Sequence, residues 1–580
     1  MSRIKYVFLI LLFACSGRNG DKLNIYSPDG KVAVELKHIE EELSFQVFWN
    51  DQLLLDSSAL GLVPDQSFTI ISATKNRVDQ SWKPVWGQFS KIRDHYGELE
   101  LTLDFGDFIG NLFLRAYNQG VAFRFIIPEN QVLEKVAYRS EYKLTPGSSF
   151  YFPSGENEPV GPVNTTTTIR KPISPPVVVE TPTGMFMSIL ESDLYSSQNF
   201  QVMNIEFDQE KELLYSLNEA TTTNSQVITP WRVILLGETV GDLVTSSVPV
   251  NLAAPNKLED ASWVKPGKTL WDWRVHGFTT SDGFTYGVDT KSYLRFIDFA
   301  AENDIEYFLI DANWYSDVDP GVFIVSDKLD LKKVADYATK KGVDLLLYYD
   351  NQKGEFGDEA LFSYYESLGM KGIKYGFMGE HVPFTQVAIE LAAESHLLIN
   401  FHDGPVPMTG IRRTLPNAVT REYCHAQQDA RRVFTPEAFI KMALINAIQG
   451  PLDMNNGNFD ILGINAGDRQ KGPRKLNSYL TTVTAEAART LIIFSGLVCI
   501  PDAPEAYAAK QDLFEFIKEQ PVGKWDESQV LHSKIGEYIC TARRYEDEWF
   551  IGSVMSQKGG SLDIPLDFLK EGITYDITFY

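Results

Sequence analysis

The feature that most constrains this chain is a long stretch in which short apolar segments alternate with amphipathic ones. Between residues 271 and 500, apolar runs such as Tyr307–Ile310 and Leu345–Tyr349 have the length of buried strands. The stretches between such runs, for example Leu331–Lys341 and Phe384–Ala393, carry apolar residues at helical spacing. This alternation over such a length predicts an eight-fold (β/α) barrel, a TIM barrel.

Several of the predicted strands end in an acid. These acids are Asp311, Asp350, Asp403 and Glu422, and His402 directly precedes Asp403. Parallel barrel strands point their carboxyl ends to one face, so these side chains are expected to converge there. Hydrolysis of a glycosidic bond uses a pair of carboxylates, one to protonate the leaving oxygen and one to activate water or attack the sugar. A single acid often only begins a loop, and a single His is often a buried, satisfied imidazole. Four strand-end acids together favour an active site.

The chain is too long for one hydrophobic core, and the pattern of apolar and polar residues changes on either side of the barrel. Residues 21–255 contain short alternating strands broken by Gly, Asn, Asp and Pro, which is typical of a β-sandwich. The catalytic barrel is predicted over 256–500 and a C-terminal β-domain over 501–580.

The C-terminal domain is expected to consist of strands. Trp549–Val554 and Leu562–Leu566 alternate as strands do, and the last residues, Thr578–Tyr580, also have strand character. The domain is therefore predicted to be incomplete.

The balance of charge limits the possible partners. A formal net charge of -24 argues against nucleic acid, because binding to phosphates requires a surplus of Lys and Arg. An apolar content of 44% indicates packed domains rather than disorder.

Residues 1–20 have the character of a targeting signal. Arg3 and Lys5 precede the apolar run Tyr6–Ala14, which is too short to span a bilayer. The run ends at Cys15 in an order similar to a bacterial lipobox, in which the chain is cleaved before the Cys and that Cys is lipidated. We therefore expect an exported bacterial protein without a transmembrane span, either a lipid-anchored outer-membrane lipoprotein or a plain periplasmic protein.

The remaining cysteines are few. Cys424, Cys499 and Cys540 are an odd and widely spaced set, which implies neither a disulfide framework nor a zinc site.

Several motifs give the chain a resemblance to glycoside hydrolase family 97. The matching segments are Ile189–Leu194, Trp271–Arg274, His402–Glu422 with its Arg413-Thr414-Leu415-Pro416-Asn417 core, Gly450–Asp453, Pro501–Tyr507, Ala542–Arg544 and Ile564–Leu569. They follow the family's order along nearly the whole chain. The resemblance implies an N-terminal β-sandwich, a catalytic barrel and a C-terminal β-domain that continues past the position of Tyr580 in other members.

The resemblance also implies a reaction. Retaining, α-galactosidase-like members carry an Asp nucleophile on the fourth barrel strand, where this chain has Gly376. The chain is therefore more similar to the inverting, α-glucosidase-like branch, in which carboxylates on the third and fifth strands activate water. Asp350 and Asp403 match those two places, where that branch has Glu. A retaining α-galactosidase-like activity is the alternative.

Further site residues follow from the same resemblance. It implies a Ca²⁺ ion bound by Glu191, Asp403, Glu422 and Gln428, which would make activity calcium-dependent, and oxygen ligands of this kind suit calcium. Next to Asp403, His402 is expected to line the sugar site, and Asp311, Trp314 and Arg412 are expected to bind substrate with it.

The general acid is where the chain departs from the family. The family has a Glu six residues beyond Glu422, whereas this chain has Gln428, which cannot donate a titratable proton, followed by Asp429. Loss of a general acid typically costs roughly 100- to 10,000-fold in rate. Two hypotheses follow: a calcium-dependent α-glycoside hydrolase with Asp429 or another group as the acid, or a relative that binds carbohydrate without turnover.

Overall fold

The computed structural model describes most of the mature chain. The described residues are 23–39, 42–63, 68–128, 135–164, 167–197, 200–221, 226–377, 381–402, 409–424, 435–461 and 481–580. Of the residues predicted to have a role, Cys15, Asp403, Gln428 and Asp429 lie outside these ranges.

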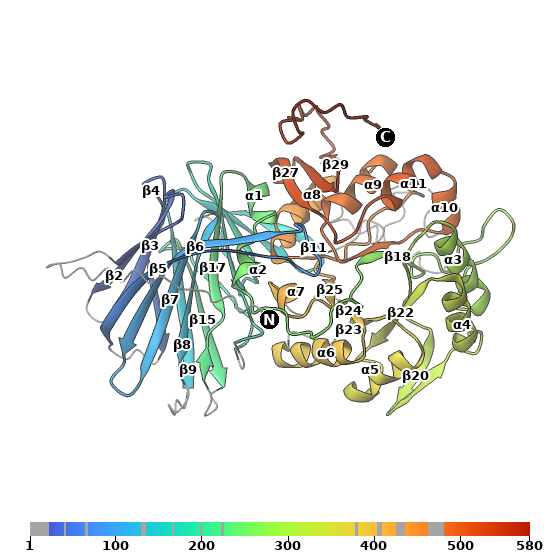
Figure 1. Ribbon diagram of the computed structural model, residues 1–580, viewed down its shortest axis with the longest axis horizontal. Helices are drawn as coiled ribbons and strands as arrows, with labels where there is room; N and C mark the ends of the chain where they lie inside the picture. Colours follow the sequence, from blue (N-terminus) through green and yellow to red (C-terminus); the bar gives the residue numbers. More distant parts are fainter. Residues whose placement is uncertain are drawn as a thin grey trace, which may run out of the picture.

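The N-terminal domain consists of two packed antiparallel sheets (Figure 1). One sheet has the order β1-β2-β3-β4-β9-β15-β14, with bounds Leu23–Tyr26, Val32–Ile39, Glu42–Trp49, Gln52–Val63, Lys135–Leu144, Leu213–Thr221 and Glu206–Asp208. The other has the order β11-β10-β12-β13-β17-β8-β7-β6-β5, with bounds Asn157–Val163, Ser149–Ser154, Val177–Glu180, Phe186–Ser192, Trp231–Gly237, Gly120–Ile127, Ile109–Tyr117, Ile92–Asp104 and Thr69–Trp82, and β16 (Val227–Ile228) pairs with β8. Their apolar faces meet in one core, where the ring centroids of Phe45 and Phe123 are 4.7 Å apart. The predicted β-sandwich is confirmed.

The central domain is a parallel, nearly closed barrel of seven regular strands. In chain order the strands are β18 (Gly267–Trp271), β19 (Tyr307–Ile310), β22 (Asp344–Asp350), β23 (Gly372–Gly376), β24 (Leu398–Phe401), β25 (Ala418–Arg421) and β26 (Leu497–Ile500). The gap between β25 and β26 is bridged by hydrogen bonds, from Gly496 N to Val419 O (3.0 Å) and from Asp453 N to Arg421 O (2.7 Å). The segment around Asp453 thus lies in the place of the remaining strand without forming a regular one. The predicted barrel architecture is confirmed.

Helices surround the barrel and also connect the domains. They are α3 (Thr290–Glu302), α4 (Leu331–Lys341), α5 (Asp358–Ser367), α6 (Val382–Glu394), α7 (Ile411–Thr414), α8 (Pro436–Leu444), α9 (Val483–Ile492), α10 (Pro504–Ala508) and α11 (Gln511–Lys518), with a 3₁₀ turn at Asn446–Gln449. Two short helices, α1 (Val240–Val244) and α2 (Val248–Leu252), end the N-terminal domain, and a hairpin of β20 (Tyr315–Asp319) and β21 (Val322–Val325) follows β19. The predicted helix over 331–341 coincides with α4, and the one over 384–393 lies within α6.

The C-terminal sheet has three antiparallel strands, β27 (Glu527–Lys534), β28 (Tyr538–Tyr545) and β29 (Glu548–Met555). It begins later than the expected residue 501, because α10 and α11 pack into the barrel core through Tyr507 and Phe514. The strand predicted over Leu562–Leu566 is wrong. Those residues are mostly exposed and pair with no strand in the described part of the chain, and an alternating pattern cannot form a strand without a neighbour.

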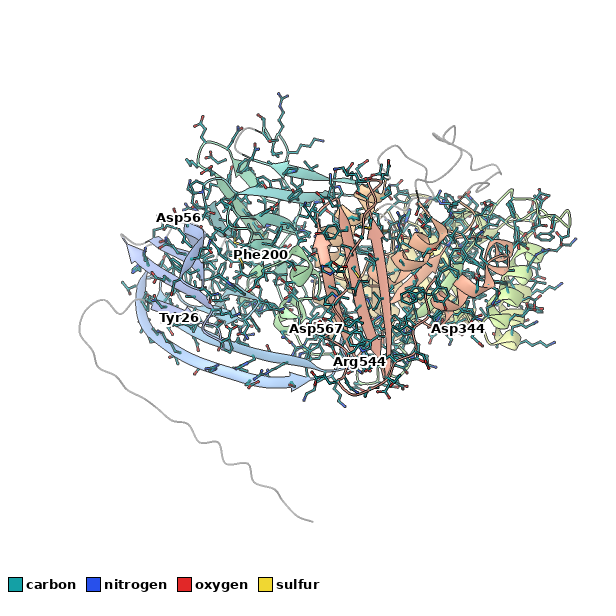
Figure 2. The ribbon with its side chains drawn as sticks, turned by 90° about the horizontal axis from the view of Figure 1, so that it is seen from above. Tyr26, Asp56, Phe200, Asp344, Arg544 and Asp567 are labelled. Carbon is teal, nitrogen blue, oxygen red and sulfur yellow. The ribbon has the colours of Figure 1, made fainter. Side chains whose placement is uncertain are left out.

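A long hairpin joins all three domains. Strands β5 and β6 run from the N-terminal sheet toward the C-terminal sheet, close to Arg544 (Figure 2). At the tip, Gly87 N donates to Gly523 O at 2.6 Å, and Trp86 Nε1 donates to Pro416 O of the barrel at 2.7 Å. The tip of this hairpin is therefore hydrogen-bonded both to the barrel and to the segment that precedes the C-terminal sheet.

Among the described residues, no helix is both long enough and apolar enough to cross a bilayer.

Candidate functional site

Strand alternation decides which barrel residues face inward. On β22, Leu346 lies in the buried cluster inside the barrel with Trp271, whereas Leu345 and Leu347 lie in the cluster beneath the helices. Because alternate residues of a strand point to opposite faces, Tyr348 shares the inward face with Leu346. Asp350 continues this face at the carboxyl end of the strand.

The ammonium group of Lys374 lies at the centre of an acidic cluster. Lys374 on β23 is fully buried, and its Nζ is 3.4 Å from Glu422 Oε2, 3.6 Å from Asp311 Oδ2 and 3.8 Å from Asp453 Oδ2. The same Nζ lies 4.8 Å from the centre of the Trp271 ring. Three carboxylates from different barrel segments therefore surround one cation, and its charge offsets their mutual repulsion.

The charges in this cluster shift the pKa values of its members. Burial alone lowers the pKa of Lys374, but Glu422, Asp311 and Asp453 outweigh it, so this pKa lies well above its ordinary value. Burial raises the pKa of Asp311, but Lys374 and His402 more than offset this, and the net pKa is lowered. Burial is also the largest cause acting on Asp453, whose pKa stays raised because Glu422 adds to burial against the effect of Lys374.

Hydrogen bonds fix the acids of the cluster. Trp271 Nε1 donates to Asp311 Oδ2 at 2.6 Å, and the backbone N–H of Asp311 donates to Asp272 Oδ1 at 2.9 Å. Asn400 Nδ2 donates to Asp453 Oδ2 at 2.7 Å. The carboxylates are therefore held in place before any ligand binds.

His402 lies at the edge of this cluster, directly after β24. Its Nδ1 is 2.6 Å from Glu422 Oε2, and its backbone N–H donates to Tyr375 O at 2.9 Å. Its ring meets two aromatic rings at nearly right angles, with centroid distances of 5.5 Å to Tyr348 and 5.1 Å to Phe377. The structure thus brings His402, Glu422 and Asp311 together, as the sequence predicts.

Asp350 ends β22 on the same face. Its Oδ1 accepts a hydrogen bond from Gln352 N at 2.9 Å, and its own N–H donates to Tyr315 Oη at 2.9 Å. Within the described ranges, Asp350 Oδ2 has no hydrogen-bond partner. One carboxylate oxygen of this largely buried acid is thus available to water or a ligand.

Gly376 leaves an inward place on the fourth strand without a side chain. A Cβ atom built at Gly376 would lie only 2.7 Å from Tyr348 Oη and 3.1 Å from two carbons of the same ring. Tyr348 therefore occupies the space into which a side chain at 376 would extend.

Two residues predicted to bind substrate lie elsewhere. Trp314 is fully buried, donates its Nε1 hydrogen to Tyr348 O at 2.7 Å and packs against Phe323, so the structure places it in the core. Arg412 is on α7, ahead of β25, and its guanidinium lies 5.3 Å from the ring of Phe494, which precedes β26. Arg412 and Phe494 both precede their strands, so Arg412 lies at the end of the barrel opposite the acidic cluster.

Two of the four calcium ligands that the resemblance implies, Glu191 and Glu422, are among the described residues. Glu191 is buried in the N-terminal domain, where its Oε2 accepts a hydrogen bond from Arg232 Nη1 and its Oε1 accepts one from Met203 N, both at 2.7 Å. Glu422 is engaged by His402 and Lys374. Among the described residues, no group of three or more His, Cys, Asp or Glu is arranged to hold a metal ion. The other two predicted ligands, Asp403 and Gln428, and the candidate acid Asp429 lie outside the described residues.

Sequence reasoning missed Lys374, Asp453 and Tyr348 as members of the site. Lys374 did carry a signal, since a charged residue within an otherwise apolar strand is rarely buried without a partner. Asp453 was part of a family motif but follows no apolar run. Tyr348 looked like any apolar strand residue.

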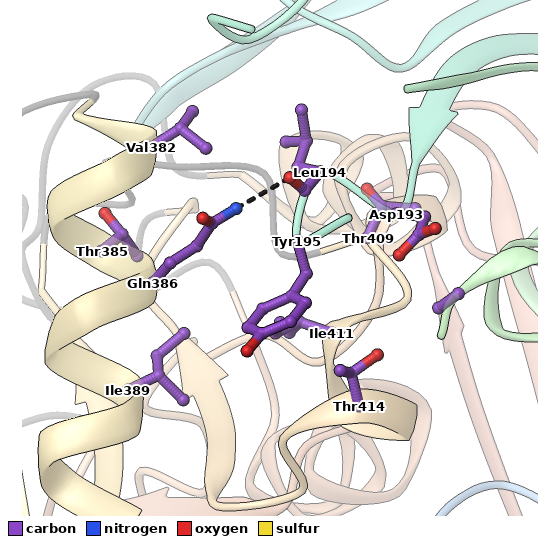
Figure 3. A pocket seen from close by; sticks show the side chains of 11 residues that line it. Asp193, Leu194, Tyr195, Val382, Thr385, Gln386, Ile389, Thr409, Ile411 and Thr414 are labelled. Atoms are coloured by element: carbon purple, nitrogen blue, oxygen red, sulfur yellow. Dashed lines mark hydrogen bonds between the residues drawn. The ribbon is translucent and has the colours of Figure 1, made fainter. Parts of the chain in front are cut away.

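Cavities also lie outside the acidic cluster, and two of them border the barrel or its contact with the N-terminal domain. A small one of about 30 Å³ lies between the segment that follows β13 in the N-terminal domain and α6, with Asp193, Tyr195 and Gln386 in its wall, and Gln386 donates to Leu194 O (Figure 3). It has room for about two water molecules. We therefore regard it as a packing gap between two domains. A larger one of about 290 Å³ lies where residues after β18 and β26 meet, with Arg274, Asn458, Asp502 and Glu505 in its wall. Burial raises the pKa of Asp502 to about 6.

Family models match three parts of the chain. The N-terminal domain of glycosyl-hydrolase family 97 matches residues 25–255, glycoside hydrolase 97 matches residues 270–424, and the C-terminal oligomerisation domain of the same family matches residues 524–580. These matches follow the order of the three domains and together cover most of the chain.

Curated relatives and a solved structure agree with these matches. A retaining alpha-galactosidase of Bacteroides thetaiotaomicron is 25% identical over 628 residues, covering 98% of this chain and 93% of that protein. A probable retaining alpha-galactosidase of Streptomyces bingchenggensis is 25% identical over 474 residues, covering 79% and 70% respectively. A family 97 enzyme from Pseudoalteromonas sp. strain K8, solved in complex with acarbose, has the same fold with a TM-score of 0.81 at 24% identity, covering 95% of this chain and 92% of that one. With matches to all three domains of one family in their proper order, the chain belongs to glycoside hydrolase family 97.

Proposed function

We propose that this protein hydrolyses α-glycosides with inversion at the anomeric carbon. Support comes from the family, from the acids at the carboxyl ends of the barrel strands, and above all from Gly376. A retaining enzyme needs a carboxylate that attacks the sugar, whereas the fourth strand has Gly376 at the matching place and Tyr348 Oη lies where its side chain would begin.

In the proposed reaction, Asp350 is one candidate base and Asp403 is the other. Asp350 Oδ2 would take a proton from water as the water oxygen attacks the anomeric carbon. The glycosidic oxygen leaves with a proton from the general acid, for which Asp429 is the sequence candidate. The acidic cluster around Lys374 would hold sugar hydroxyls in this scheme, since its carboxylates are already fixed by hydrogen bonds.

The second candidate is a retaining α-galactosidase, favoured by the names of both curated relatives. The third is carbohydrate binding without turnover, favoured by Gln428 at the expected position of the acid. Calcium binding by Glu191 and Glu422 is a separate proposal, in which the ion would replace the cationic partner of each acid, Arg232 and Lys374 respectively.

Product stereochemistry separates the candidates. Aryl α-glucosides and α-galactosides with a dinitrophenol leaving group need little help from an acid, and proton NMR identifies the anomer that forms first. The β-anomer first supports inversion, whereas the α-anomer first supports the retaining alternative. Tight sugar binding without any turnover overturns both enzyme hypotheses.

Asp350→Asn tests the base. We expect a loss of roughly 100- to 10,000-fold in kcat, as for removal of a general base. Asp344→Asn is the matched control, because Asp344 begins the same strand at the opposite end of the barrel. Equal activity of the Asp350 variant and the wild type would assign the base to Asp403.

We also propose that the protein acts outside the cytoplasm, on the basis of the apolar run before Cys15. Cys15→Ala should move the protein from the membrane fraction to the soluble periplasmic fraction if the Cys carries lipid. An unchanged distribution would favour plain export.

A further inference from the structure

The residue after Gly376 has an unusual backbone conformation and an exposed ring. Phe377 has φ of +57°, in the left-handed region, and 37% of its surface is exposed. A bulky residue in this region is a true outlier, and its cost is borne only where the surroundings or the function require it. A single exposed Phe is ordinary, but a single exposed Phe on a strained backbone beside an acidic cluster is not.

The position of the ring is fixed by its neighbours. Phe377 follows the carboxyl end of the fourth barrel strand, and its ring meets the His402 ring at 88° with centroids 5.1 Å apart. His402 in turn is held by Glu422 and by the backbone of Tyr375. The exposed surface of Phe377 therefore lies next to the imidazole that borders the acidic cluster.

The local chemistry favours a sugar ring as the occupant. Two groups of contrasting character meet here: fixed carboxylates and an imidazole, which suit hydroxyl groups, and an aromatic ring, which suits an apolar surface. A pyranose has both features, with hydroxyls around its rim and C–H groups on one face. Binding sites combine a few placed polar groups with aromatic surface in this way.

We propose that Phe377 is the aromatic platform on which a pyranose ring of the substrate stacks. The left-handed backbone at 377 turns the ring outward directly after Gly376, so that the ring borders the site rather than joining the core beneath the helices. This inference rests on the proposed function, since it assumes a glycoside ligand, and it adds a residue that determines sugar affinity.

Three substitutions test the platform. Phe377→Leu and Phe377→Gly remove the ring, whereas Phe377→Tyr keeps it. The probes are acarbose, methyl α-glucoside and methyl α-galactoside, with dissociation constants measured by calorimetry. For the sugars that the wild type binds, we expect the Leu and Gly variants to bind about five- to tenfold more weakly and the Tyr variant to bind within about twofold.

Stability separates a binding role from a packing role. Gly adopts left-handed φ without strain, so Phe377→Gly should keep or raise the melting temperature while it weakens sugar binding. A residue needed only for packing would show the reverse, a lower melting temperature with unchanged affinity. Tyr26→Ala removes an exposed aromatic from the N-terminal sheet and should change neither sugar affinity nor kcat/KM.

The outcomes distinguish this inference from the proposed function. Sugar binding by the wild type with unchanged affinity in the Leu and Gly variants would overturn the platform alone. Weaker binding in those variants without turnover by the wild type would support the platform and overturn the hydrolase. Absence of binding of all three probes to the wild type would overturn both.

Discussion

Tyr348 Oη lies 2.7 Å from the point at which Gly376 would carry a Cβ atom, so the third barrel strand fills the space left empty by the fourth. Real Cβ contacts are not this short, and the nearby ring carbons at 3.1 Å leave little room to move. The fourth strand has no side chain at this place, and the Tyr of the third strand packs into the space. The two features therefore depend on each other.

Gly376→Ala is expected to destabilise the protein by about 1–3 kcal/mol through overpacking. Tyr348→Ala alone should also destabilise it by leaving a cavity. The double variant should lose about 0.5–3 kcal/mol less stability than the two single variants lose together. Chemical denaturation of the wild type and the three variants measures this difference as a double-mutant cycle. Gly61→Ala is the control, because a Cβ there meets nothing within 4 Å. Additive effects at 376 and 348 would contradict the steric link.

Lys374→Met should be strongly destabilising, by about 3–5 kcal/mol, because it leaves buried carboxylates without their cation. The pKa of Asp311 is lowered in the native protein, so this acid adds stability that is present above its unfolded pKa near 3.8 and is lost at lower pH. Without Lys374 the acids become harder to ionise. The loss of folding stability in Lys374→Met should therefore grow as pH rises from about 5 to about 8.

Denaturant unfolding at several pH values measures this effect. Lys268→Met is the control. The buried Lys268 faces a single carboxylate, Glu306 at 3.5 Å, so this substitution should cost less stability. A loss that is equal at all pH values would show that Lys374 acts through packing.

Asp502 should make stability depend on pH. Its folded pKa of about 6 is above the ordinary 3.8, so the folded protein holds a proton that the unfolded chain has already lost. Stability should therefore fall as pH rises from about 4 to about 6 and level off above that, by roughly 3 kcal/mol in total. Asp502→Asn should flatten this part of the profile, and a slope that persists in the variant would assign it to other groups.

The contribution of Glu191 to stability should not depend on calcium. Glu191→Gln breaks a fully buried pair with Arg232 and should cost about 3–5 kcal/mol. Unfolding in excess calcium and in excess chelator should show the same loss. A loss that appears only with calcium would mean that Glu191 leaves Arg232 to bind the ion, as the family resemblance predicts.

Calcium binding by the wild type is a separate test. An ion that binds only the native state must raise the melting temperature at saturation. A rise in the wild type that survives in Glu191→Gln would assign the ion to other acids, whereas no rise would contradict the calcium prediction.

The three-domain architecture and the family could both be predicted from the order and type of the residues. The alternation of buried strands with amphipathic helices indicated a parallel sheet covered on both faces, and its length favoured a barrel. That topology fixed the end of the barrel at which Asp311, Asp350, His402 and Glu422 lie, since parallel strands share one direction. These four residues could therefore be predicted from local pattern alone.

Which side chains meet could not be predicted from the sequence. Lys374 is far from both Glu422 and Asp453 in the chain, and its contacts with them exist only because the barrel closes. Trp314 and Arg412 had suitable chemistry but point into a core and to the opposite end of the barrel, respectively. The space of Gly376 is filled by a residue of the neighbouring strand. A sequence records the order and type of its residues, whereas the direction of a side chain and the identity of its neighbours depend on strand register and barrel closure.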